Sequence, residues 1–320
     1  MVVDRCIRRI RNEYHFAVKA ERRAVVSGAF NAVHQLLNES VQLSRCSSLS
    51  GGCTNEVSVV ELCDGRRFVV KAYQDGDAAV AERVGLEHLA KYSPLRTPEV
   101  TGLVAGGQEP AHSYLVLEYI EAAAGGQTSW RKLGEMLALQ HQVPASATVG
   151  PVNRFGFPSD NFIGATRQPN SWSFSWVDFF GKHRLGFQFQ LAKQNGADTE
   201  LLQRGAALIE RLDRWLPASP AAALVHGDLW SGNVMFASDG APVQIDPAIY
   251  YAHHETDLAL ASLFGGFDRA FWDAYHATFP PTAGWQERLE IYKLYHVVNH
   301  FNLFGGSYAL QAMNILRRFA

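Results

Sequence analysis

The sequence is poor in cysteine and has no long apolar run. Its 320 residues contain four cysteines, Cys6, Cys46, Cys53 and Cys63, with no C-x-x-C pair and no histidine at zinc-finger spacing. A disulfide framework and a zinc finger are therefore excluded, and so few thiols predict a cytoplasmic protein in a reducing compartment. No stretch approaches the roughly 20 apolar residues that a membrane-spanning helix needs, so we expect no membrane partner.

The sequence also has little net charge, with 29 Lys and Arg against 31 Asp and Glu. This balance is uneven, because residues 1–30 carry a net charge of +4 and the rest of the chain carries −6. An acidic body is a poor surface for nucleic acid, whose binding depends largely on phosphate neutralisation, so no nucleic-acid partner is expected. Residues 1–30 lack the apolar core and cleavage site of a targeting peptide, which favours an added N-terminal helix or an over-extended start.

The first third of the chain is predicted to contain a small antiparallel sheet. β-Branched runs at 57–62 and 68–70 flank Asp64-Gly65, and an Asp-Gly pair between such runs predicts a tight hairpin. Near-helical spacing of apolar residues predicts a helix over 77–92, and the apolar run at 114–117 predicts a buried strand. The glycine stretch at 123–126 is the best candidate for a domain boundary.

Beyond this boundary the chain is predicted to be mainly helical. The periodicity predicts helices at 129–142, 173–194, 198–215, 256–263 and 285–303, interrupted by short apolar runs at 223–225 and 243–245. With 47% hydrophobic residues, the chain can bury a large core. We therefore expect an α+β fold with an N-terminal extension at 1–30, a sheet-containing domain at 31–122 and a helical domain at 123–320.

Three polar residues near the short apolar runs carry the most specific chemical signal. Asp228 and Asn233 lie five residues apart after the first run, and Asp246 follows the second. Phosphoryl transfer needs such a set: one carboxylate accepts the proton of the attacking hydroxyl, and an amide and a second carboxylate bind Mg²⁺. Alone, Asp-x4-Asn fits a capped turn equally well, but His226-Gly227 before it and Asp246 after it favour catalysis.

Upstream residues supply a candidate phosphate-binding region. The loop before the first predicted strand contains Gly51, Gly52 and Cys53. Glycines allow backbone N–H groups to approach phosphates, although a Gly-Gly loop is more often a plain turn. Lys71 at the end of the next strand could reach the α- and β-phosphates. Glu82 on the following helix is the expected partner of Lys71, with Glu87 as the alternative.

The order of these parts resembles the protein-kinase-like fold. After the loop, the lysine and the helix glutamate, an apolar strand runs into Glu118-Tyr119 and is followed by His-Gly-Asp-x4-Asn and a later aspartate. His-Gly-Asp stands where protein kinases have His-Arg-Asp, Asp246-Pro247 replaces Asp-Phe-Gly, and no activation segment follows. In these departures the sequence resembles small-molecule kinases of the aminoglycoside phosphotransferase type. The resemblance implies a bilobal fold, with a small antiparallel β-sheet N-lobe and a larger, mainly helical C-lobe.

From about residue 31 to the C-terminus, the sequence resembles the fructosamine kinase (ketosamine-3-kinase) family. The ordered segments that carry the resemblance are 154–164 (RFGFPSDNFIG), 168–172 (QPNSW), 226–233, 246–247, 254–258, 264–267 (FGGF) and 304–305. The loop reads Gly-Gly-Cys-Thr-Asn where the family usually has Gly-Gly-Ser-Ile-Asn or a Cys variant. One helix reads Leu139-Gln140-His141 where Leu-His is usual.

This resemblance implies ATP-dependent phosphorylation of the 3-hydroxyl of a ketosamine (fructosamine, ribulosamine or erythrulosamine), the rearranged adduct of a sugar with an amine. The 3-phosphate then leaves spontaneously and frees the amine, so the reaction deglycates its substrate. The implied partners are small ketosamines or glycated lysines on proteins, and the enzyme would be a monomer or a homodimer.

The resemblance also implies a role for each candidate residue. ATP would be bound by Gly51, Gly52, Cys53, Lys71 and Glu82, with the backbone of Glu118, Tyr119 and Ile120 meeting adenine. Asp228 would be the catalytic base, Asn233 and Asp246 would bind Mg²⁺, and Asp257 would brace the catalytic loop.

Substrate contacts are expected from aromatic residues. Trp230, two residues after the expected base, could stack on the sugar or attract the amine through a cation–π interaction worth about 0.5–2 kcal/mol. Trp172 and Trp176 are spaced by four on a presumed helix, a spacing more typical of core residues. Trp172 and His226 nevertheless remain candidates for substrate contacts.

Two further signals admit alternative interpretations. His253-His254-Glu255 could form a metal cluster, but adjacent histidines point in different directions on a helix, which disfavours it. Cys53, beside backbone N–H dipoles in the nucleotide loop, could have increased thiolate character. We hypothesise that its oxidation blocks ATP binding; a Cys53→Ser variant equally sensitive to peroxide would contradict this.

Two other functions match part of the pattern. A small-molecule kinase acting on an aminoglycoside, choline or a homoserine-like alcohol is disfavoured by the segment 154–164 and the tryptophans after it. A nucleotide-binding pseudokinase without turnover is disfavoured because degenerate kinases usually lose the lysine, the base or a metal ligand. Here Lys71, Asp228, Asn233 and Asp246 are all present.

Overall fold

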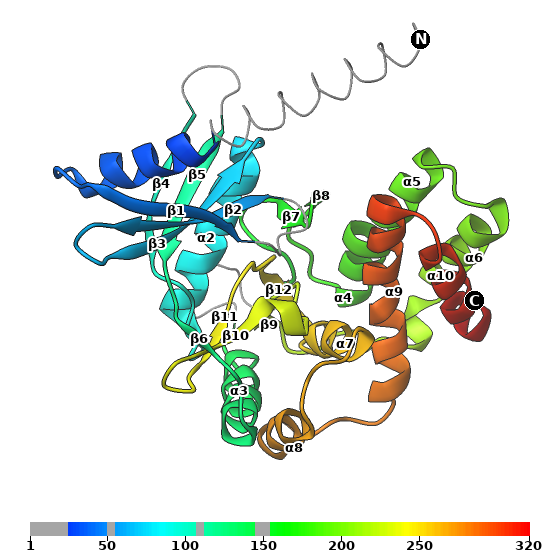
Figure 1. Ribbon diagram of the computed structural model, residues 1–320. Helices are drawn as coiled ribbons and strands as arrows, with labels where there is room; N and C mark the ends of the chain where they lie inside the picture. The colour runs from blue at the N-terminus through cyan, green and yellow to red at the C-terminus, as the bar shows by residue number, and fades with distance from the viewer. Residues whose placement is uncertain (1–24, 50–54, 107–111, 145–153) are drawn as a thin grey trace, which may run out of the picture. The chain divides into compact units, whose positions relative to one another are not determined.

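The computed structural model describes residues 25–49, 55–106, 112–144 and 154–320 (Figure 1). They belong to two compact units. The first unit consists of the described residues up to Arg83 together with Glu99–Tyr119. The second unit consists of Val84–Pro98 and Ile120–Ala320. The predicted nucleotide-loop residues Gly51, Gly52 and Cys53 lie outside the described residues, as does the basic segment before residue 25. The domain limits expected at 31–122 and 123–320 stay a prediction.

The first unit is built on a five-stranded antiparallel sheet with the order β1-β2-β3-β5-β4. The strands are β1 (Leu43–Leu49), β2 (Glu56–Leu62), β3 (Arg67–Tyr73), β4 (Val100–Val104) and β5 (Ser113–Glu118). The predicted hairpin joins β2 to β3, and Gly65 in its turn has a φ of +88°, which a glycine adopts without strain. The sequence did not predict β1 or β4. β1 is largely exposed, so it lacks the alternating apolar pattern that identifies a half-buried strand.

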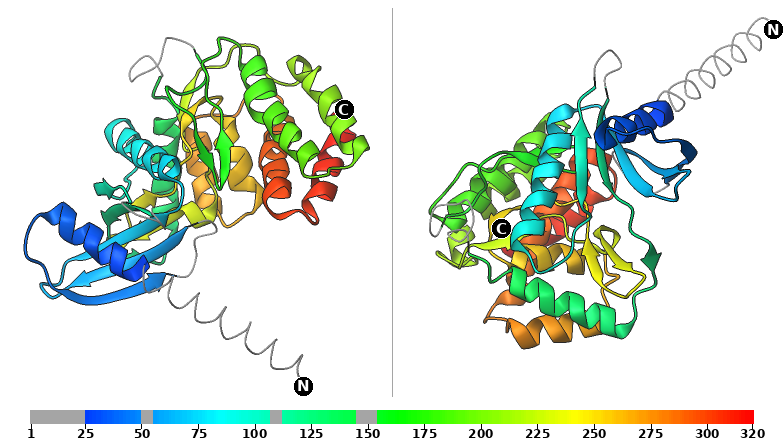
Figure 2. Two further views of the ribbon diagram at one scale, coloured as in Figure 1. Left: turned by 90° about the horizontal axis from the view of Figure 1, so that it is seen from above. Right: turned by 90° about the vertical axis from the view of Figure 1, so that its left-hand side faces the viewer.

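A helix over residues 25–37 covers one face of this sheet (Figure 2). Its Ala29 and Val33 pack into a buried cluster with Val70 of β3. Gly28 allows the close approach, because a Cβ at this position would overlap the hydroxyl of Tyr114. Residues 25–30, expected to be part of an extension, therefore contribute to the core of the first unit.

Helix α2 (Gly76–Tyr92) follows β3, close to its predicted limits. The division between the two units falls inside this helix, so Glu82 belongs to the first unit, while Leu86 and Leu89 belong to the second. Both leucines are fully buried.

The second unit contains three small groups of strands. β9 (Ala223–Val225) pairs with β12 (Tyr250–Ala252), and β7 (Asn161–Ile163) pairs with β8 (Thr166–Gln168). β10 (Val234–Ala237) lies between β11 (Pro242–Gln244) and β6 (Ala122–Ala123). β9 and β11 correspond to the two short apolar runs in the sequence, so each is followed by one of the predicted catalytic segments.

Helices make up most of the second unit. They include α3 (Gln127–Gln140), α6 (Thr199–Ile209), α7 (Glu255–Leu263), α8 (Arg269–Thr278), α9 (Trp285–Phe304) and α10 (Tyr308–Phe319). α3 packs along α8, and α9 contacts both α7 and α10 (Figure 1). Gly134 lets α3 approach α8, since a Cβ there would overlap the carbonyl oxygen of Phe271. The periodicity did not single out α8 or α10. The combination of a small antiparallel sheet with a larger helical part is confirmed.

The single helix predicted over 173–194 is wrong in detail. The segment forms α4 (Trp176–Phe179), the π-helix η2 (Phe180–Gly186) and α5 (Phe187–Gln194). Trp172 precedes α4, so its spacing from Trp176 does not place the two rings on one helical face. Trp176 is fully buried and donates its indole N–H to the hydroxyl of Tyr292 at 2.8 Å. It is therefore a core residue.

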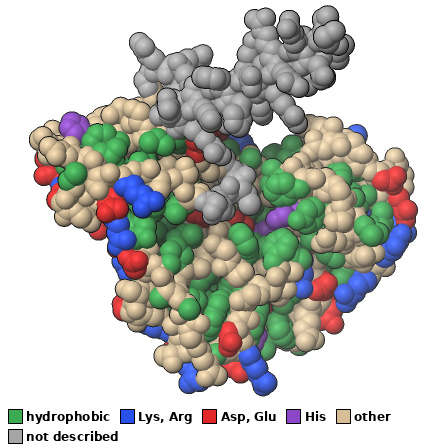
Figure 3. All heavy atoms as spheres, in the orientation of Figure 1, with side chains coloured by type: hydrophobic (Ala, Val, Ile, Leu, Met, Phe, Trp, Pro, Cys, Tyr) green, Lys and Arg blue, Asp and Glu red, His purple; other side chains and the backbone are tan. Residues whose placement is uncertain are grey.

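The lengths of the helices and the charges on the surface bear on the expected absence of membrane and nucleic-acid partners. Among the helices in the described ranges, all are too short or too polar to cross a bilayer. On the face shown in Figure 3, Lys and Arg side chains are scattered among Asp and Glu side chains.

Candidate active site

The loop that follows β9 carries the predicted base and takes a conformation that requires glycine. Gly227 has a φ of +81°, and a Cβ there would overlap the carbonyl oxygen of Ala248. The N–H of Ala248 donates to the carbonyl of His226 at 2.9 Å, which holds the two segments together. The glycine of His-Gly-Asp is therefore required by the backbone of this loop.

Asp257 on α7 anchors the same loop. Its Oδ2 accepts from the N–H of His226 at 2.7 Å, and its Oδ1 accepts from the N–H of Gly227 at 2.8 Å. Nε2 of His141 lies 3.1 Å from Oδ2, and Nδ1 of His141 lies 2.8 Å from the hydroxyl of Tyr275. Burial alone would raise the pKa of Asp257, but the hydrogen bond from His141, the charges of His141 and His226 and the backbone N–H of His226 together outweigh it and lower the pKa. A buried, ionised carboxylate thus fixes the loop backbone.

His226 connects the loop to the segment before Asp246. Its Nδ1 accepts from the N–H of Asp228 at 3.2 Å, so Nε2 carries the proton and donates to the carbonyl of Ile245 at 2.9 Å. The side chain is fully buried, and burial lowers the pKa of His226. Because both ring nitrogens are engaged inside the chain, the structure makes His226 a positioning residue and not the substrate contact suggested by the sequence.

Asp228 and Asn233 form the centre of the loop. Nδ2 of Asn233 donates both to the backbone oxygen of Asp228 at 2.9 Å and to its carboxylate Oδ2 at 3.0 Å. Burial raises the pKa of Asp228 to about 7; the hydrogen bond from Asn233 opposes this shift and the charge of Asp246 adds to it. A carboxylate with a pKa near neutrality is well matched to accept a proton from a hydroxyl.

The pairing of β10 with β11 brings the two predicted metal ligands together. Val234, directly after Asn233, pairs with Gln244, and the N–H of Ile245 donates to the carbonyl of Asn233 at 3.0 Å. Asp246 follows with a φ of +54°. Such a left-handed conformation is unfavourable for a non-glycine residue, although Asp tolerates it better than most, and it is typical of functional sites.

The donor atoms in this region fit a magnesium ion. Both hydrogen bonds of the Asn233 amide come from its nitrogen, so its oxygen Oδ1 remains as a ligand. Asp246 adds a carboxylate whose negative charge already raises the pKa of Asp228. Amide and carboxylate oxygens are ligands that Mg²⁺ accepts, with water and phosphate completing its shell.

In the first unit, Lys71 and Glu82 form a tight ion pair. Nζ of Lys71 lies 2.6 Å from Oε1 of Glu82, and only 9% and 12% of the two side chains are exposed. Tyr73 donates its hydroxyl to the second oxygen of Glu82. Lys71 and Tyr73 both lie on β3, and Glu82 lies on the first part of α2. The contact is the one expected for a lysine that is held in position for phosphates.

The predicted adenine-binding residues lie at the end of β5. Glu118 donates its N–H to the carbonyl of Glu99 and accepts from the N–H of Glu99, so the strand end is tied to the residue before β4. The guanidinium of Arg67 lies 4.2 Å from the ring centre of Tyr119. Ile120, the next residue, belongs to the second unit. It is 7% exposed and packs in a cluster with Val243.

The tryptophans suggested as substrate contacts are both partly exposed. Trp230 precedes the 3₁₀-helix η4 (Ser231–Asn233) in the catalytic loop. Trp172 stacks on Tyr251, with ring centres 6.2 Å apart, and packs against the main core. Trp230 therefore lies in the same loop as Asp228, whereas Trp172 has a packing role; contact of either ring with substrate stays a prediction.

The family model described as fructosamine kinase matches residues 27–320. The chain belongs to the fructosamine kinase family. A probable ketoamine kinase of Synechocystis sp. is 41% identical over 290 residues, which cover 89% of this chain and 94% of the relative. A chloroplastic protein-ribulosamine 3-kinase of Arabidopsis thaliana is 35% identical over 280 residues, covering 87% of this chain and 83% of the relative.

Solved structures agree with the family. A proposed fructosamine-3-kinase from Haemophilus somnus 129PT superposes with a TM-score of 0.77 at 27% identity, covering 90% of this chain and 95% of that protein. An aminoglycoside phosphotransferase, APH(4)-Ia, has a TM-score of 0.61 at 16% identity, covering 87% and 95%, a likeness that concerns the fold alone. The predicted protein-kinase-like fold is thus confirmed.

Membership in the fructosamine kinase family confirms the predicted resemblance and an ATP-dependent kinase. The family model begins at residue 27, slightly before the expected limit at 31. The two alternatives, a kinase of the aminoglycoside or choline type and a nucleotide-binding pseudokinase, are not favoured by the relatives.

Several residues that support the fructosamine kinase site were not identified from the sequence. His141, at the end of α3, contacts Asp257, which lies 116 residues later in the chain. Tyr73 shares Glu82 with Lys71. The only sequence signal for His141 is that Gln140-His141 stands where the family usually has Leu-His. Spacing cannot reveal such contacts, because the partners lie on different elements.

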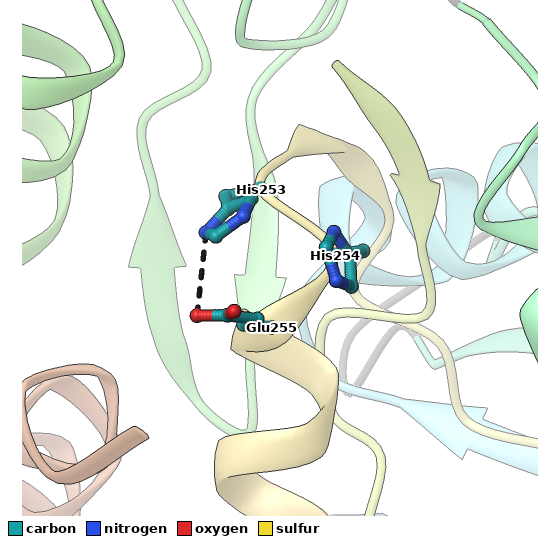
Figure 4. A group of neighbouring side chains, drawn as sticks. All are labelled: His253, His254 and Glu255. Atoms are coloured by element: carbon teal, nitrogen blue, oxygen red, sulfur yellow. Dashed lines mark ion pairs between the residues drawn. The ribbon is translucent and has the colours of Figure 1, made fainter. Parts of the chain in front are cut away.

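The structure brings His253, His254 and Glu255 together (Figure 4). The argument that the two histidines diverge on a helix was wrong, because α7 begins only at Glu255 and the two rings lie 4.6 Å apart. Both carboxylate oxygens of Glu255 accept from Arg288, at 2.6 and 2.7 Å, and Nδ1 of His253 lies 2.9 Å from the hydroxyl of Tyr292. These interactions occupy both oxygens of Glu255 and Nδ1 of His253 and place the positive charge of Arg288 beside them, so the cluster is poorly suited to a metal ion.

Proposed function

We propose that this fructosamine kinase family member transfers phosphate from ATP to the 3-hydroxyl of a ketosamine. The observation that carries the proposal is the arrangement of Asp228, Asn233 and Asp246 within one loop and its adjoining hairpin. The relatives named ketoamine kinase and protein-ribulosamine 3-kinase support this substrate class. Spontaneous loss of the 3-phosphate would then free the amine.

Asp228 is proposed to accept the proton of the sugar hydroxyl, because it lies in the loop fixed by Asn233 and burial raises its pKa to about 7. Asn233 and Asp246 would hold Mg²⁺, which when bound would neutralise charge on the phosphates. His226 and Asp257 keep the loop backbone in place through the hydrogen bonds described above. Trp230, beside the base, would contact the substrate.

The nucleotide is proposed to meet residues of the first unit. Lys71, held by Glu82, would bind phosphate oxygens. Gly51, Gly52 and Cys53 would cover the phosphates, and the backbone of Glu118, Tyr119 and Ile120 would meet adenine. These roles follow the order of parts in protein-kinase-like enzymes.

The acceptor amine is proposed to be a lysine on a protein as well as a small ketosamine. The plant relatives are named protein-ribulosamine 3-kinase, which supports a protein-bound substrate. The low cysteine content supports the proposed cytoplasmic location. The proposed assembly is a monomer or a homodimer.

A panel of acceptors tests this function. Purified protein with ATP and Mg²⁺ is offered ribulosyl-, erythrulosyl- and fructosyl-lysine and an aminoglycoside, and ADP release is followed together with the free lysine that appears later. Turnover of a ketosamine, followed by release of lysine, is the expected result. Turnover of the aminoglycoside alone would show a different acceptor class, and nucleotide binding without turnover of any acceptor would show a pseudokinase.

A further inference from the structure

Two helices of the second unit end in the same way. α7 is followed by Phe264-Gly265-Gly266, and α9 ends at Phe304, followed by Gly305-Gly306. All four glycines have positive φ values, between +63° and +87°, which allow the chain to turn sharply directly after each phenylalanine. Phe264 remains 44% exposed and Phe304 remains 56% exposed.

The two phenylalanines belong to one row of rings that begins in the catalytic loop. The ring of Trp230 lies 6.4 Å from that of Phe264, which lies 5.1 Å from His300. His300 in turn lies 5.7 Å from Phe304 and 5.1 Å from Tyr308. We call these five residues the aromatic row. Trp230 belongs to the loop that carries Asp228, and its backbone N–H donates to the carbonyl of Asp228 at 3.1 Å, so the row begins in this loop and ends at the exposed ends of two helices.

The first turn is attached to the catalytic loop. Gly266 lies so close to Ser231 that a Cβ would come 2.5 Å from the serine Oγ. Ser231 is the first residue of η4 and directly follows Trp230. The turn that follows Phe264 therefore packs closely against the loop that carries Asp228.

The aromatic row is uncharged, and its ring faces suit a cationic, partly apolar ligand. Nδ1 of His300 donates to the carbonyl of His296 at 2.7 Å, and burial lowers the pKa of His300, so the ring is neutral. The other four members are uncharged aromatic rings, whose faces attract a cation and pack against methylene groups. Exposed large aromatic rings that lie next to one another are typical of binding surfaces.

We propose that the aromatic row binds the polypeptide that carries a glycated lysine. This proposal rests on the proposed function, because the sugar must lie at Asp228. A small ketosamine at Asp228 would meet no ring beyond Trp230, whereas the row continues through Phe264 and His300 to Phe304 and Tyr308. The outer rings would contact the lysine stem and the residues next to it, and the cationic amine would face the ring surfaces.

The test compares a peptide-borne substrate with a free one. Ribulosyl-lysine and a short peptide containing one ribulosylated lysine between leucines are assayed with Phe264→Ser and Phe304→Ser variants. Leu139→Ser is the matched control, because Leu139 is a 48% exposed apolar residue on α3 and lies outside the row. We expect each variant in the row to raise KM for the peptide at least fivefold, with kcat for the peptide and both constants for ribulosyl-lysine changed less than twofold.

Three outcomes would overturn the proposal. Equal changes for both substrates would show that the outer rings belong to the sugar pocket. Unchanged constants for the peptide would show that the row does not bind the carrier. Loss of a dimer in the variants, measured by light scattering, with an unchanged peptide KM would show that the row binds a second copy of the chain.

A failure of the proposed function is recognised separately. If the unmodified protein phosphorylates neither substrate, the function fails, and binding of the fluorescently labelled glycated peptide still tests the row. Wild type must then bind the glycated peptide, with affinity at least fivefold weaker in Phe304→Ser and unchanged in Leu139→Ser. Equal binding by all three proteins would contradict the inference.

Discussion

Asn233 binds Asp228 twice through a single amide nitrogen, at 2.9 Å to the backbone oxygen and at 3.0 Å to the carboxylate. This pair of hydrogen bonds fixes Asp228, the proposed base, relative to the loop and leaves the amide oxygen of Asn233 for another ligand. The residue that holds the base in place is thus also the residue proposed to hold Mg²⁺. Changes at either position are expected to affect transfer more strongly than folding.

Replacing Asp228 with Asn is expected to remove the base and to leave the fold intact. An amide oxygen can still accept the hydrogen bond from Asn233, but it cannot take the substrate proton, so kcat should fall by about 10²–10⁴-fold. ATP affinity, measured by calorimetry, should change less than threefold. Asp213→Asn, on an exposed carboxylate, is the control. A variant at Asp228 that retained a tenth of the activity would identify a different base.

Asp257→Asn is expected to destabilise the second unit and to slow transfer. The carboxylate accepts from the N–H groups of both His226 and Gly227, and an amide can accept on only one side, so one buried donor loses its acceptor. Such a loss costs about 1–3 kcal/mol, or more where a charged group is involved. Urea unfolding and kcat measure the two effects. Unchanged stability together with unchanged kcat would show that the catalytic loop does not depend on this anchor.

Gly227→Ala is expected to be much more damaging than Gly196→Ala. Both glycines have a φ near +80°, so both substitutions carry the strain of a left-handed alanine, about 1 kcal/mol. A Cβ at Gly196 meets nothing within 4 Å, whereas a Cβ at Gly227 overlaps the carbonyl oxygen of Ala248. Thermal unfolding and kcat of the two variants therefore separate strain from overlap. Similar losses in both would mean that the loop relaxes to accept the extra methyl group.

Lys71→Met is expected to raise KM for ATP at least tenfold, because the ion pair with Glu82 holds the ammonium group proposed to bind phosphates. The exposed Lys132 provides the matched control, Lys132→Met. Tyr73 still donates to Glu82 in the variant, so the carboxylate keeps one partner. Initial rates over a series of ATP concentrations test the effect, and an unchanged KM would remove Lys71 from the nucleotide site.

The protein is expected to lose stability as the pH falls below about 6.5. Burial lowers the pKa of His88 to about 4, of His253 and His296 to about 3, and of His254 to about 2. Below pH 6.5 these side chains take up protons in the unfolded chain and not in the folded one. Each therefore removes about 1.4 kcal/mol of stability per pH unit until its folded pKa is reached.

Urea unfolding at pH 7.5 and 5.5 measures this dependence. His296→Asn removes one titrating group, so the decrease between the two pH values should become smaller by about 1 kcal/mol, the share of a single histidine over this interval. An equal decrease in His296→Asn and in the unmodified protein would show that His296 does not titrate differently in the folded and unfolded chains.

Local elements could be predicted where short-range chemistry decides them. The Asp64-Gly65 hairpin and α2 follow from neighbouring residues, and the structure places both close to their expected limits. The segment 173–194 was predicted less well, because its apolar spacing does not distinguish an α-helix from the π-helix that interrupts it at Phe180–Gly186. The exposed strand β1 carries too few apolar residues to be recognised.

The order and identity of the chemical groups were determined by the sequence itself, because a lysine, an aspartate and an asparagine retain their chemistry wherever they lie in the chain. The spacing of Asp228, Asn233 and Asp246 was enough to indicate the type of reaction, and the ordered motifs carried the resemblance to the family. Tertiary structure alone decided that His226 supports the loop through Ile245, that His141 reaches Asp257, and that Phe264 meets His300. These contacts join residues that are 19 to 116 positions apart, and only the packing of whole helices and strands brings such residues together.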